Sequence, residues 1–570
     1  MCPDGRITNV FIDNKSIFDI DDLEDGALGW AYGLANKLHV RTRASFIRRE
    51  LLFEVGDCHD PVLLEESGRV LRSYGFIARA DVFAVDQPDG SKHVVVDTQD
   101  EWTTKIDLGV SFDDGLQLEV LDVTEENLFG QGILAGAFLR RRRERRDRGL
   151  RLELPRLFGT RLDAVAAVGR TRVGEFYQGA INYPFVGEVG RFAVRQTFRR
   201  RDELFPYALN PGDEFSHVLL PLLDERAEAS VAFRVGRPGN LTMFGLGVSR
   251  ETLEFADLPS SVDVARNNDF GNSETAPEEY VGAVIGQTHA ASTTRLNFLV
   301  GQRNLRFPRV RGLDPLDGEQ DIRLGTDIGL TLGRSLGVLS AGELPASDDL
   351  YSRLRLFAGH DPGTSYVFLN LGLEGRYLIS GTSTGESWRD VVGELDVYGY
   401  IRSRRMPGHT FFARVSGAGG WLMETPFQLT LGGRSAVRGY NEEDDPGARR
   451  LILTLEDRIF VRWPAPDLID LGFTFFGDLG RMWAGDVPFG RDSGWRGTVG
   501  GGLRVGFPAG SRGVVRFDVA FPLGEDNTRG PIFRVTLFES LGLVAGFFDP
   551  QLERSRRITV GPDFFVTEVR

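Results

Sequence analysis

Three charged residues in the last third of the chain have the types and spacing of an ion-pair cluster. Arg438 follows a glycine-rich run, and Glu456 and Asp478 come later in segments where apolar and polar side chains alternate. In an extended segment every second side chain points to the same side, which puts both carboxylates opposite the Leu and Phe side chains. A guanidinium group can donate to two carboxylate oxygens at once in a bidentate contact, which the ammonium group of lysine cannot make. Strand parity therefore places Glu456 and Asp478 on one side, where a single guanidinium such as that of Arg438 is able to bind both; the alternative is three unrelated, solvated charges.

Other residues that carry chemistry give weaker signals. Residues 381–385 match the G-x-S-x-G motif of serine hydrolases, but an alternating run follows where that motif needs a helix, which favours a loop. The seven histidines are scattered and there are two cysteines, so no metal site is predicted. Cys2 and Cys58 are expected to form a disulfide if the chain lies in an oxidising compartment; the alternative is an incidental pair.

The three charged residues lie within a long series of predicted strands in which apolar and polar side chains alternate. From about residue 103 to 541, short runs alternate apolar and polar side chains and are separated by Gly, Pro, Asp and Asn. Val515, Phe517 and Val519, for example, oppose Arg516 and Asp518. This pattern is typical of a membrane β-barrel with a lipid-facing side and a polar lumen. A soluble sandwich or barrel also alternates, but the free use of Phe and Leu on one side favours the membrane.

One basic cluster lies at the expected tip of the second hairpin. Arg140, Arg141, Arg142 and Arg143 begin the run RRRRERRDR. Guanidinium groups bind phosphates well, so this run is a candidate contact for lipopolysaccharide phosphates if the barrel lies in an outer membrane. The alternative is a solvated loop that its own acidic residues partly neutralise.

Composition excludes several classes of protein. The 570 residues are 41% hydrophobic, which is too apolar for a disordered chain. No stretch approaches the ~18 uncharged apolar residues of a membrane-spanning helix. The net charge of −14 argues against a nucleic-acid partner. The first ten residues have no apolar signal core, so either the chain is cytosolic or a signal peptide lies upstream of this numbering.

The first hundred residues have a different pattern, with the order strand, helix, helix, strand, strand. The clearest helix covers residues 60–74, where Asp60 is a good N-cap, Pro61 occupies the first turn and Gly75 follows the end. Strands are expected at 7–18, 77–85 and 93–98 and a first helix at 43–53, with residues 20–42 as an insertion. Residues 1–103 are therefore predicted to form a small α+β domain.

Several segments resemble the BamA/TamA-like outer-membrane assembly and translocation proteins, the bacterial surface antigen superfamily. The run Val437, Arg438, Gly439, Tyr440 is similar to the VRGF/Y loop motif of that family. Asn127, Gly130 and Gly132 are similar to its N-x-x-G-x-G turn early in the barrel. Residues 475–480 resemble its F-x-D-x-G strand, and residues 1–103 resemble one POTRA domain. The resemblance covers nearly the whole chain.

The resemblance implies a mostly β fold in which the Arg438 loop folds back into the barrel lumen and Arg438 binds Asp478 and Glu456. One POTRA domain at 1–103 would lie in the periplasm and precede an antiparallel transmembrane β-barrel of sixteen strands at 104–540, in the outer membrane of a Gram-negative-type bacterium. About twenty strand-like runs are countable, and we attribute the excess to the less regular region 200–350. Residues 541–570 form a C-terminal extension of unclear structure.

The implied function is not enzymatic and needs no cofactor. It is that of an assembly factor, or insertase, that receives proteins through the POTRA domain and a weak seam between the first strand, 105–112, and the last, 532–540. The alternatives are a secretion pore for one exoprotein and a passive porin or structural outer-membrane protein. Implied partners are outer-membrane lipid and lipopolysaccharide, unfolded client proteins, and periplasmic chaperones or accessory lipoproteins, with no nucleic acid.

Overall fold

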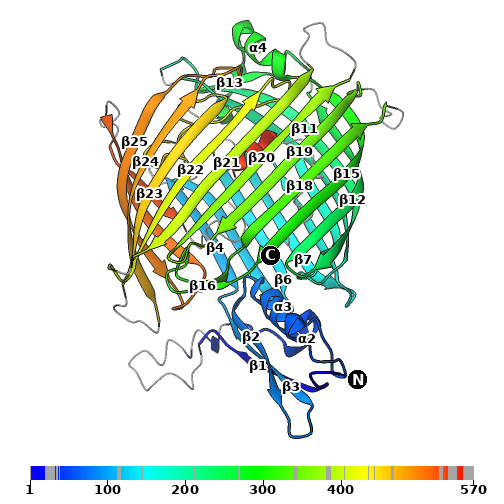
Figure 1. The fold of residues 1–570 in the computed structure, drawn as a ribbon. Helices are drawn as coiled ribbons and strands as arrows, with labels where there is room; N and C mark the ends of the chain where they lie inside the picture. Colours follow the sequence, from blue (N-terminus) through cyan, green and yellow to red (C-terminus); the bar gives the residue numbers. More distant parts are fainter. Residues whose placement is uncertain are drawn as a thin grey trace.

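The described part of the chain forms a small N-terminal α/β unit and a large β-sheet that curls into a barrel (Figure 1). This computed structural model describes residues 2–18, 33, 36–37, 39–111, 117–142, 145–210, 212–255, 257–266, 270–337, 344–379, 387–403, 405–433, 436–441, 443–461, 463, 468–524, 530–536 and 549–555. Within these ranges, no helix is long and apolar enough to cross a membrane.

The N-terminal unit has a three-stranded sheet with two helices packed on it. In chain order its elements are β1 (Ile7–Lys15), α2 (Ala44–Glu50), α3 (Pro61–Arg72), β2 (Ile77–Asp86) and β3 (Lys92–Asp100). The central strand β3 pairs parallel with β1 and antiparallel with β2. Apolar side chains of both helices and all three strands form its core. A disulfide joins Cys2 to Cys58, as the sequence suggested.

Helix α3 begins and ends where its flanking residues satisfy the helix-terminal backbone groups. The Asp60 carboxylate accepts from the backbone N–H of Val62 at 2.9 Å, and Pro61 starts the helix without needing an N–H partner. Past its last turn, the Arg512 guanidinium from the barrel donates to the carbonyl oxygens of Arg72 and Tyr74 at 2.6 Å each. A cation at this end also interacts favourably with the helix dipole.

The barrel wall is one antiparallel sheet whose consecutive strands are mostly hydrogen-bonded neighbours. Its strands are β4 (Thr104–Ser111), β5 (Gln117–Leu128), β6 (Ile133–Arg142), β7 (Arg145–Leu157), β8 (Leu162–Arg170), β9 (Glu175–Tyr183), β10 (Phe192–Ala208), β11 (His217–Arg237), β12 (Asn240–Glu254), β15 (Ala291–Arg306), β18 (Leu324–Ser335), β19 (Asp349–His360), β20 (Ser365–Leu378), β21 (Trp388–Arg402), β22 (His409–Trp421), β23 (Arg449–Val461), β24 (Asp470–Trp483), β25 (Gly494–Gly506), β26 (Val514–Pro522) and β27 (Ile532–Thr536). The strand order returns from β27 to β4.

The wall has more strands than the sixteen that the resemblance implied. The barrel sheet has twenty-two strands among the described residues, namely the twenty given above and two short strands between β12 and β15, whereas about twenty strand-like runs are countable in the sequence. The region 200–350 is the reason for the difference. It contributes long wall strands, such as the 21-residue β11, and its loops carry additional short elements that obscure the alternation. The alternating runs of the sequence therefore correspond to strands of the wall, including those in the region 200–350.

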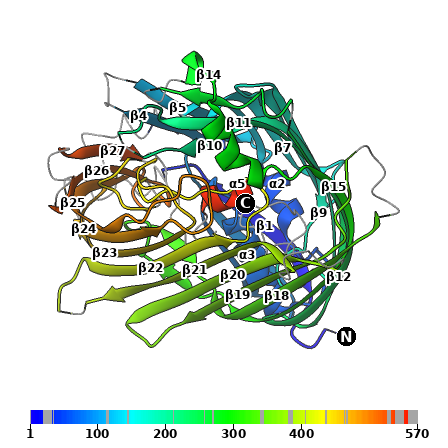
Figure 2. The same cartoon turned by 90° about the horizontal axis from the view of Figure 1, so that it is seen from above.

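Short elements lie at both ends of the barrel. At the end away from the N-terminal unit, the far end, these are β13 (Asp263–Ala265), β14 (Glu274–Thr275) and α4 (Glu278–Val284) (Figure 1). At the near end, the hairpin of β16 (Arg309–Arg311) and β17 (Glu319–Asp321) lies between the barrel and the unit. Helix α5 (Pro550–Ser555), in the predicted extension 541–570, lies inside the barrel when it is viewed from above (Figure 2).

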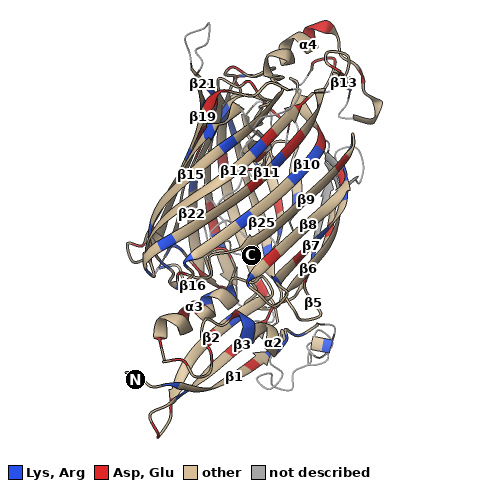
Figure 3. Cartoon of the chain, turned by 90° about the vertical axis from the view of Figure 1, so that its right-hand side faces the viewer, with Lys and Arg blue, Asp and Glu red and all other residues tan. Residues whose placement is uncertain are grey.

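Side chains of the wall alternate between an apolar outer face and a polar inner face. Along β24, Phe473 and Phe475 are 42% and 60% exposed, whereas Asp478 on the other side is 4% exposed. Charged residues occur along the wall strands (Figure 3), and four arginines of the inner face are less than 2% exposed. These four are Arg234, Arg295, Arg303 and Arg504.

Candidate functional site in the barrel lumen

The segment between β22 and β23 is an unusually buried loop. We call residues 422–448 the Arg438 loop. Its apolar side chains form a core cluster inside the barrel together with residues of β21, β23 and β24. Phe427, Leu429, Leu431 and Val437 have no exposed surface. Because a solvated surface loop would not bury four large apolar side chains, this segment packs within the lumen as a fixed part of the fold.

The Arg438 guanidinium is held by two carboxylates from neighbouring strands. Its Nε and Nη2 atoms donate to the two oxygens of Asp478, each at 2.8 Å. Its Nη1 atom donates to Oε1 of Glu456 at 2.7 Å. The structure therefore brings together the three residues that the sequence predicted, and the contact with Asp478 is the bidentate fork that only arginine makes.

Strand geometry explains why these carboxylates face the loop. Glu456 on β23 points inward and is 7% exposed, whereas its neighbour Leu455 points outward and is 66% exposed. Thr454, on the same inner face and directly opposite Asp478, donates its hydroxyl to Asp478 Oδ1 at 3.0 Å. The ring of Phe476 lies 3.5 Å from the guanidinium carbon, a cation–π contact that fixes the plane of the group.

The other residues of the VRGY run fix the tip of the loop against the wall. A Cβ atom at Gly439 would lie 2.4 Å from the hydroxyl of Thr498 on β25, so only glycine fits there. The carbonyl oxygen of Tyr440 accepts from Arg534 Nη2 at 2.8 Å. Since Arg534 lies on β27, the loop tip contacts the last described strand of the wall as well as β23, β24 and β25.

We expect Gly439→Val to unseat the loop tip while the wall stays folded. The new side chain would overlap Thr498, and such overpacking costs about 1–3 kcal/mol. Limited proteolysis should show faster cleavage within residues 422–448. Gly282→Ala is a matched control, because a Cβ atom at Gly282 meets no atom within 4 Å. Equal cleavage rates for both variants would contradict the seating described here.

The early turn motif forms a joint with the N-terminal unit, a role that the sequence did not indicate. Asn127 has no exposed surface; its Oδ1 accepts from the Gly132 N–H at 2.7 Å, and its Nδ2 donates to Thr42 at 2.8 Å. The carbonyl of Gly130 accepts from the Arg43 N–H at 2.8 Å. Gly130 and Gly132 both have positive φ, and a Cβ atom at Gly132 would lie 2.6 Å from the Phe46 ring.

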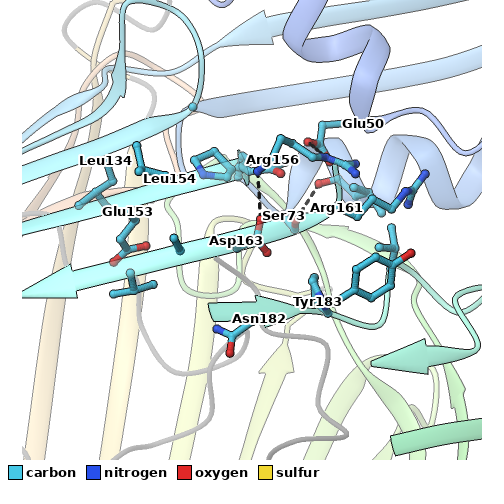
Figure 4. A pocket seen from close by; sticks show the side chains of 18 of the residues that line it. Glu50, Ser73, Leu134, Glu153, Leu154, Arg156, Arg161, Asp163, Asn182 and Tyr183 are labelled. Carbon is cyan, nitrogen blue, oxygen red and sulfur yellow. Dashed lines mark hydrogen bonds and ion pairs between the residues drawn. The ribbon is translucent and has the colours of Figure 1, made fainter. Parts of the chain in front are cut away.

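Ion pairs and a cavity extend this joint toward β7–β10. Arg156 donates to both carboxylate oxygens of Glu50, at 2.6 and 2.7 Å (Figure 4). Arg69 and the Glu188 N–H both donate to the carboxylate of Glu66. Burial alone would raise the pKa of Glu66, but the hydrogen bonds and charge of Arg69 outweigh it and keep this pKa below its ordinary value.

A cavity lies at the same joint between the N-terminal unit and the barrel. It is lined by aromatic, apolar and charged residues of both parts, among them Tyr74, Phe76, Leu134, Tyr183 and Arg161.

We expect Gly132→Val to loosen the joint without unfolding the barrel. The variant combines an unfavourable backbone conformation with overlap of the Phe46 ring, which together cost about 1–3 kcal/mol. Protease cleavage after Asp100, at the connection to the barrel, should accelerate. Gly159→Ala separates the two causes, because Gly159 has a similar φ of +73° but no atom within 4 Å of its Cβ position. The joint description fails if Gly159→Ala accelerates cleavage as much as Gly132→Val does.

Several predicted sites lie wholly or partly outside the described residues. Arg140, Arg141 and Arg142 belong to β6, but their side chains are not described, and Arg143 lies outside the described residues. The G-x-S-x-G run at 381–385 and residues 537–540 of the expected last strand also lie outside them. The lipopolysaccharide contact therefore stays a prediction.

The ion-pair network continues beyond Glu456 to partners that we did not predict from the sequence. Arg458 Nε donates to Glu456 Oε2 at 2.8 Å, and Arg458 Nη1 donates to Asp314 Oδ1 at 3.0 Å. Every second side chain of a strand lies on the same face, so this rule would have identified Arg458, which lies two residues after Glu456. No such signal identifies Asp314, because it lies in the hairpin between β15 and β18, outside any alternating run.

The fold and the site together define a β-barrel protein with an α/β unit docked at one end and an arginine loop bound in the lumen. No protein-family model matches the chain, and no curated protein has a significant sequence match to it. Among solved structures, BamA from Haemophilus ducreyi lacking POTRA domains 1–3 is similar at 14% identity and a TM-score of 0.40, over 93% of this chain and 84% of that one. CdiB from Escherichia coli is similar at 12% identity and a TM-score of 0.37, over 94% and 90% of the two chains. CdiB from Acinetobacter baumannii is similar at 12% identity and a TM-score of 0.36, over 94% of this chain and 74% of that one. At such scores these similarities do not contribute to the argument that follows.

Proposed function

We propose that this chain is an outer-membrane β-barrel protein that assembles or translocates other proteins, and that its specific role is that of an insertase. The observation that carries the proposal is the Arg438 loop, held by Asp478 and Glu456 inside a barrel whose near end carries a docked α/β unit. A pore that passes small solutes needs no docked unit.

The outer face of the wall supports a membrane location. Large apolar side chains are exposed there on strands from β10 to β27, which in water would be an extensive unfavourable surface. In a bilayer the same surface faces lipid, while the charged side chains of the inner face pair with one another. Examples of the exposed side chains are Phe198, Leu246, Phe298, Phe475 and Phe533.

Two strand edges support the handling of other polypeptides. In the N-terminal unit, β1 and β2 are the edge strands, and an edge strand pairs with an incoming extended chain through its backbone groups. In the wall, β27 pairs with β26 over Ile532–Thr536 and is the neighbour of β4 in the strand order. The proposed seam for a client strand lies between β27 and β4, the last described strand and the first.

Depleting the protein in its bacterium tests the proposal. An insertase should lower the outer-membrane levels of many β-barrel proteins, measured by quantitative proteomics of the membrane fraction. Loss of a single secreted protein would instead identify a dedicated secretion pore. Unchanged levels of every outer-membrane and secreted protein would contradict both roles and leave a passive porin or a structural protein.

A further inference from the structure

The near-end hairpin, residues 307–323, reaches into the lumen although it connects two adjacent wall strands. It joins β15, which ends at Arg306, to β18, which begins at Leu324. Its tip contains Leu313, Asp314 and Leu316, which are 2%, 4% and 7% exposed. A tip in solvent would leave such residues exposed, so this tip is embedded in the barrel. The hairpin consequently has one side toward the N-terminal unit and one toward the lumen (Figure 1).

The outer side of the hairpin binds the N-terminal unit. Arg72 at the end of α3 donates to both carboxylate oxygens of Asp321, at 2.8 and 3.0 Å. Arg309 donates to Asp81 of β2 at 2.7 Å. The Arg72–Asp321 pair is mostly buried and bidentate, which is the geometry that makes an ion pair specific.

The inner side of the hairpin binds the residues that hold Arg438. Asp314 Oδ1 accepts from the Tyr400 hydroxyl at 2.6 Å and from Arg458 Nη1 at 3.0 Å. The backbone carbonyl of Asp314 accepts from Arg504 at 2.7 Å. Arg458 in turn shares the carboxylate of Glu456 with Arg438, since each guanidinium binds a different oxygen. The contacts therefore run without a gap from Asp314 to Arg438.

We propose that Asp314 is a positioning residue for the Arg438 loop, and that the near-end hairpin couples the seating of this loop to the docking of the N-terminal unit. The physical reason is the sharing of Arg458. With Asp314 in place, Arg458 is held between two carboxylates and orients Glu456 toward Arg438. Without that carboxylate, Arg458 lacks one of its two anionic partners and Tyr400 lacks its acceptor, so the buried network rearranges.

The coupling rests on the proposed function only in its claim that the N-terminal unit receives client proteins. If it does, a client that shifts the unit also shifts Asp321, and the hairpin transmits this displacement to Asp314. The loop would then respond at one end of the lumen to an event at the other. The connection itself is independent of what the protein does and is testable without a client.

The test measures how fast a cysteine in the Arg438 loop reacts with a maleimide. Ala436 is 6% exposed, so Ala436→Cys reports each unseating of the loop, and the native cysteines are already paired in a disulfide. The reporter is placed in the full-length protein, alone and together with Asp314→Asn, Asp321→Asn or both. Asparagine keeps the shape of the side chain and removes its charge.

We expect Asp314→Asn to accelerate labelling about tenfold, within the usual range of coupling between sites. Asp321→Asn should accelerate it as well, although it breaks only the contact with Arg72. The double variant should react no faster than Asp314→Asn alone, because both substitutions interrupt one path. Asp317→Asn is the matched control: its carboxylate lies 4.0 Å from Arg311 on the same hairpin, and it should change nothing.

Three results would overturn the proposal: unchanged labelling in Asp321→Asn, fully multiplicative effects in the double variant, or acceleration by Asp317→Asn. If Asp314→Asn does not fold, Tyr400→Phe removes only the hydroxyl donor and should give a smaller acceleration in the same direction. Because labelling needs no client, a failed insertase assay with accelerated labelling would refute the proposed function and leave the positioning role standing.

Discussion

Arg438→Ala should give a barrel that folds but no longer supports the assembly of client proteins. Without the guanidinium, Asp478 loses the donors Nε and Nη2 and retains the Thr454 hydroxyl and the backbone N–H of residue 438, which donates at 3.3 Å. Leaving a buried charged group short of partners costs about 1–3 kcal/mol. The expected results are a lower unfolding temperature, faster proteolysis of residues 422–448 and loss of insertion of an unfolded barrel protein into proteoliposomes.

Two further variants separate the role of Arg438 from general stability. Arg438→Lys keeps the charge but cannot make the bidentate contact, so it should be intermediate. Arg226→Ala removes another buried lumenal arginine, whose Nε donates to Asp224 on β11 at 2.9 Å. It should lower the unfolding temperature comparably and leave insertion intact. If Arg226→Ala and Arg438→Ala impair insertion equally, the loop has no special role.

The second large effect is expected at the seam, where covalent closure should abolish insertion. In the hydrocarbon core every backbone donor and acceptor of the wall needs a partner, so most strands cannot separate without large cost. The contact between β27 and β4 is the place where a client strand can pair with a wall edge. An oxidised cysteine pair across it should therefore stop insertion without affecting the barrel, and reductant should restore it.

The outward-facing residues of the two strands give the cysteine positions. Ile106 of β4 and Phe533 of β27 are 44% and 58% exposed on the outer face. Ile106→Cys should be combined in turn with Phe533→Cys and with Val535→Cys, since a disulfide needs Cα atoms within about 7 Å. Both double-cysteine variants should also carry Cys2→Ser and Cys58→Ser, so that reductant acts on the disulfide at the seam alone.

A lock on the other side of β27 is the matched control. Val519 and Phe533 are direct partners across β26 and β27, so Val519→Cys with Phe533→Cys crosslinks the same strand without closing the seam. This variant should retain insertion when oxidised. Full activity with the seam quantitatively crosslinked would refute the insertase and favour a pore that passes its substrate through the lumen.

Local patterns predicted the strands, the N-terminal helices and the Arg438 cluster because each depends on residues that are close in sequence or on strand parity. The alternation around Glu456 and Asp478 determined which way both carboxylates point, and Asp60 with Pro61 marked the start of α3. The predicted number of strands was wrong because we took sixteen from the family resemblance instead of the number of alternating runs in the sequence. Counting the alternating runs gave the better value.

Contacts between distant segments could not be predicted in the same way. Asp314 meets Arg458 across 144 positions of the chain, and Arg72 meets Asp321 across 249. Nothing in the local sequence of a hairpin indicates which lumenal arginine its tip will reach. The glycines of the early turn illustrate the same limit: their spacing predicted a turn, but the Phe46 ring that requires Gly132 lies in another part of the fold.

Helix α5 has a consequence for the strand that precedes it. Gln551 accepts from the Thr430 N–H at 3.0 Å and from Arg450 at 2.8 Å, and Leu552 has no exposed surface, so α5 is anchored to the Arg438 loop and β23. Because the chain is continuous from β27 to α5, a β27 that had left both neighbours would still be held at both of its ends. Rebinding is then intramolecular, and a client strand held at β4 has to compete with a strand that never diffuses away.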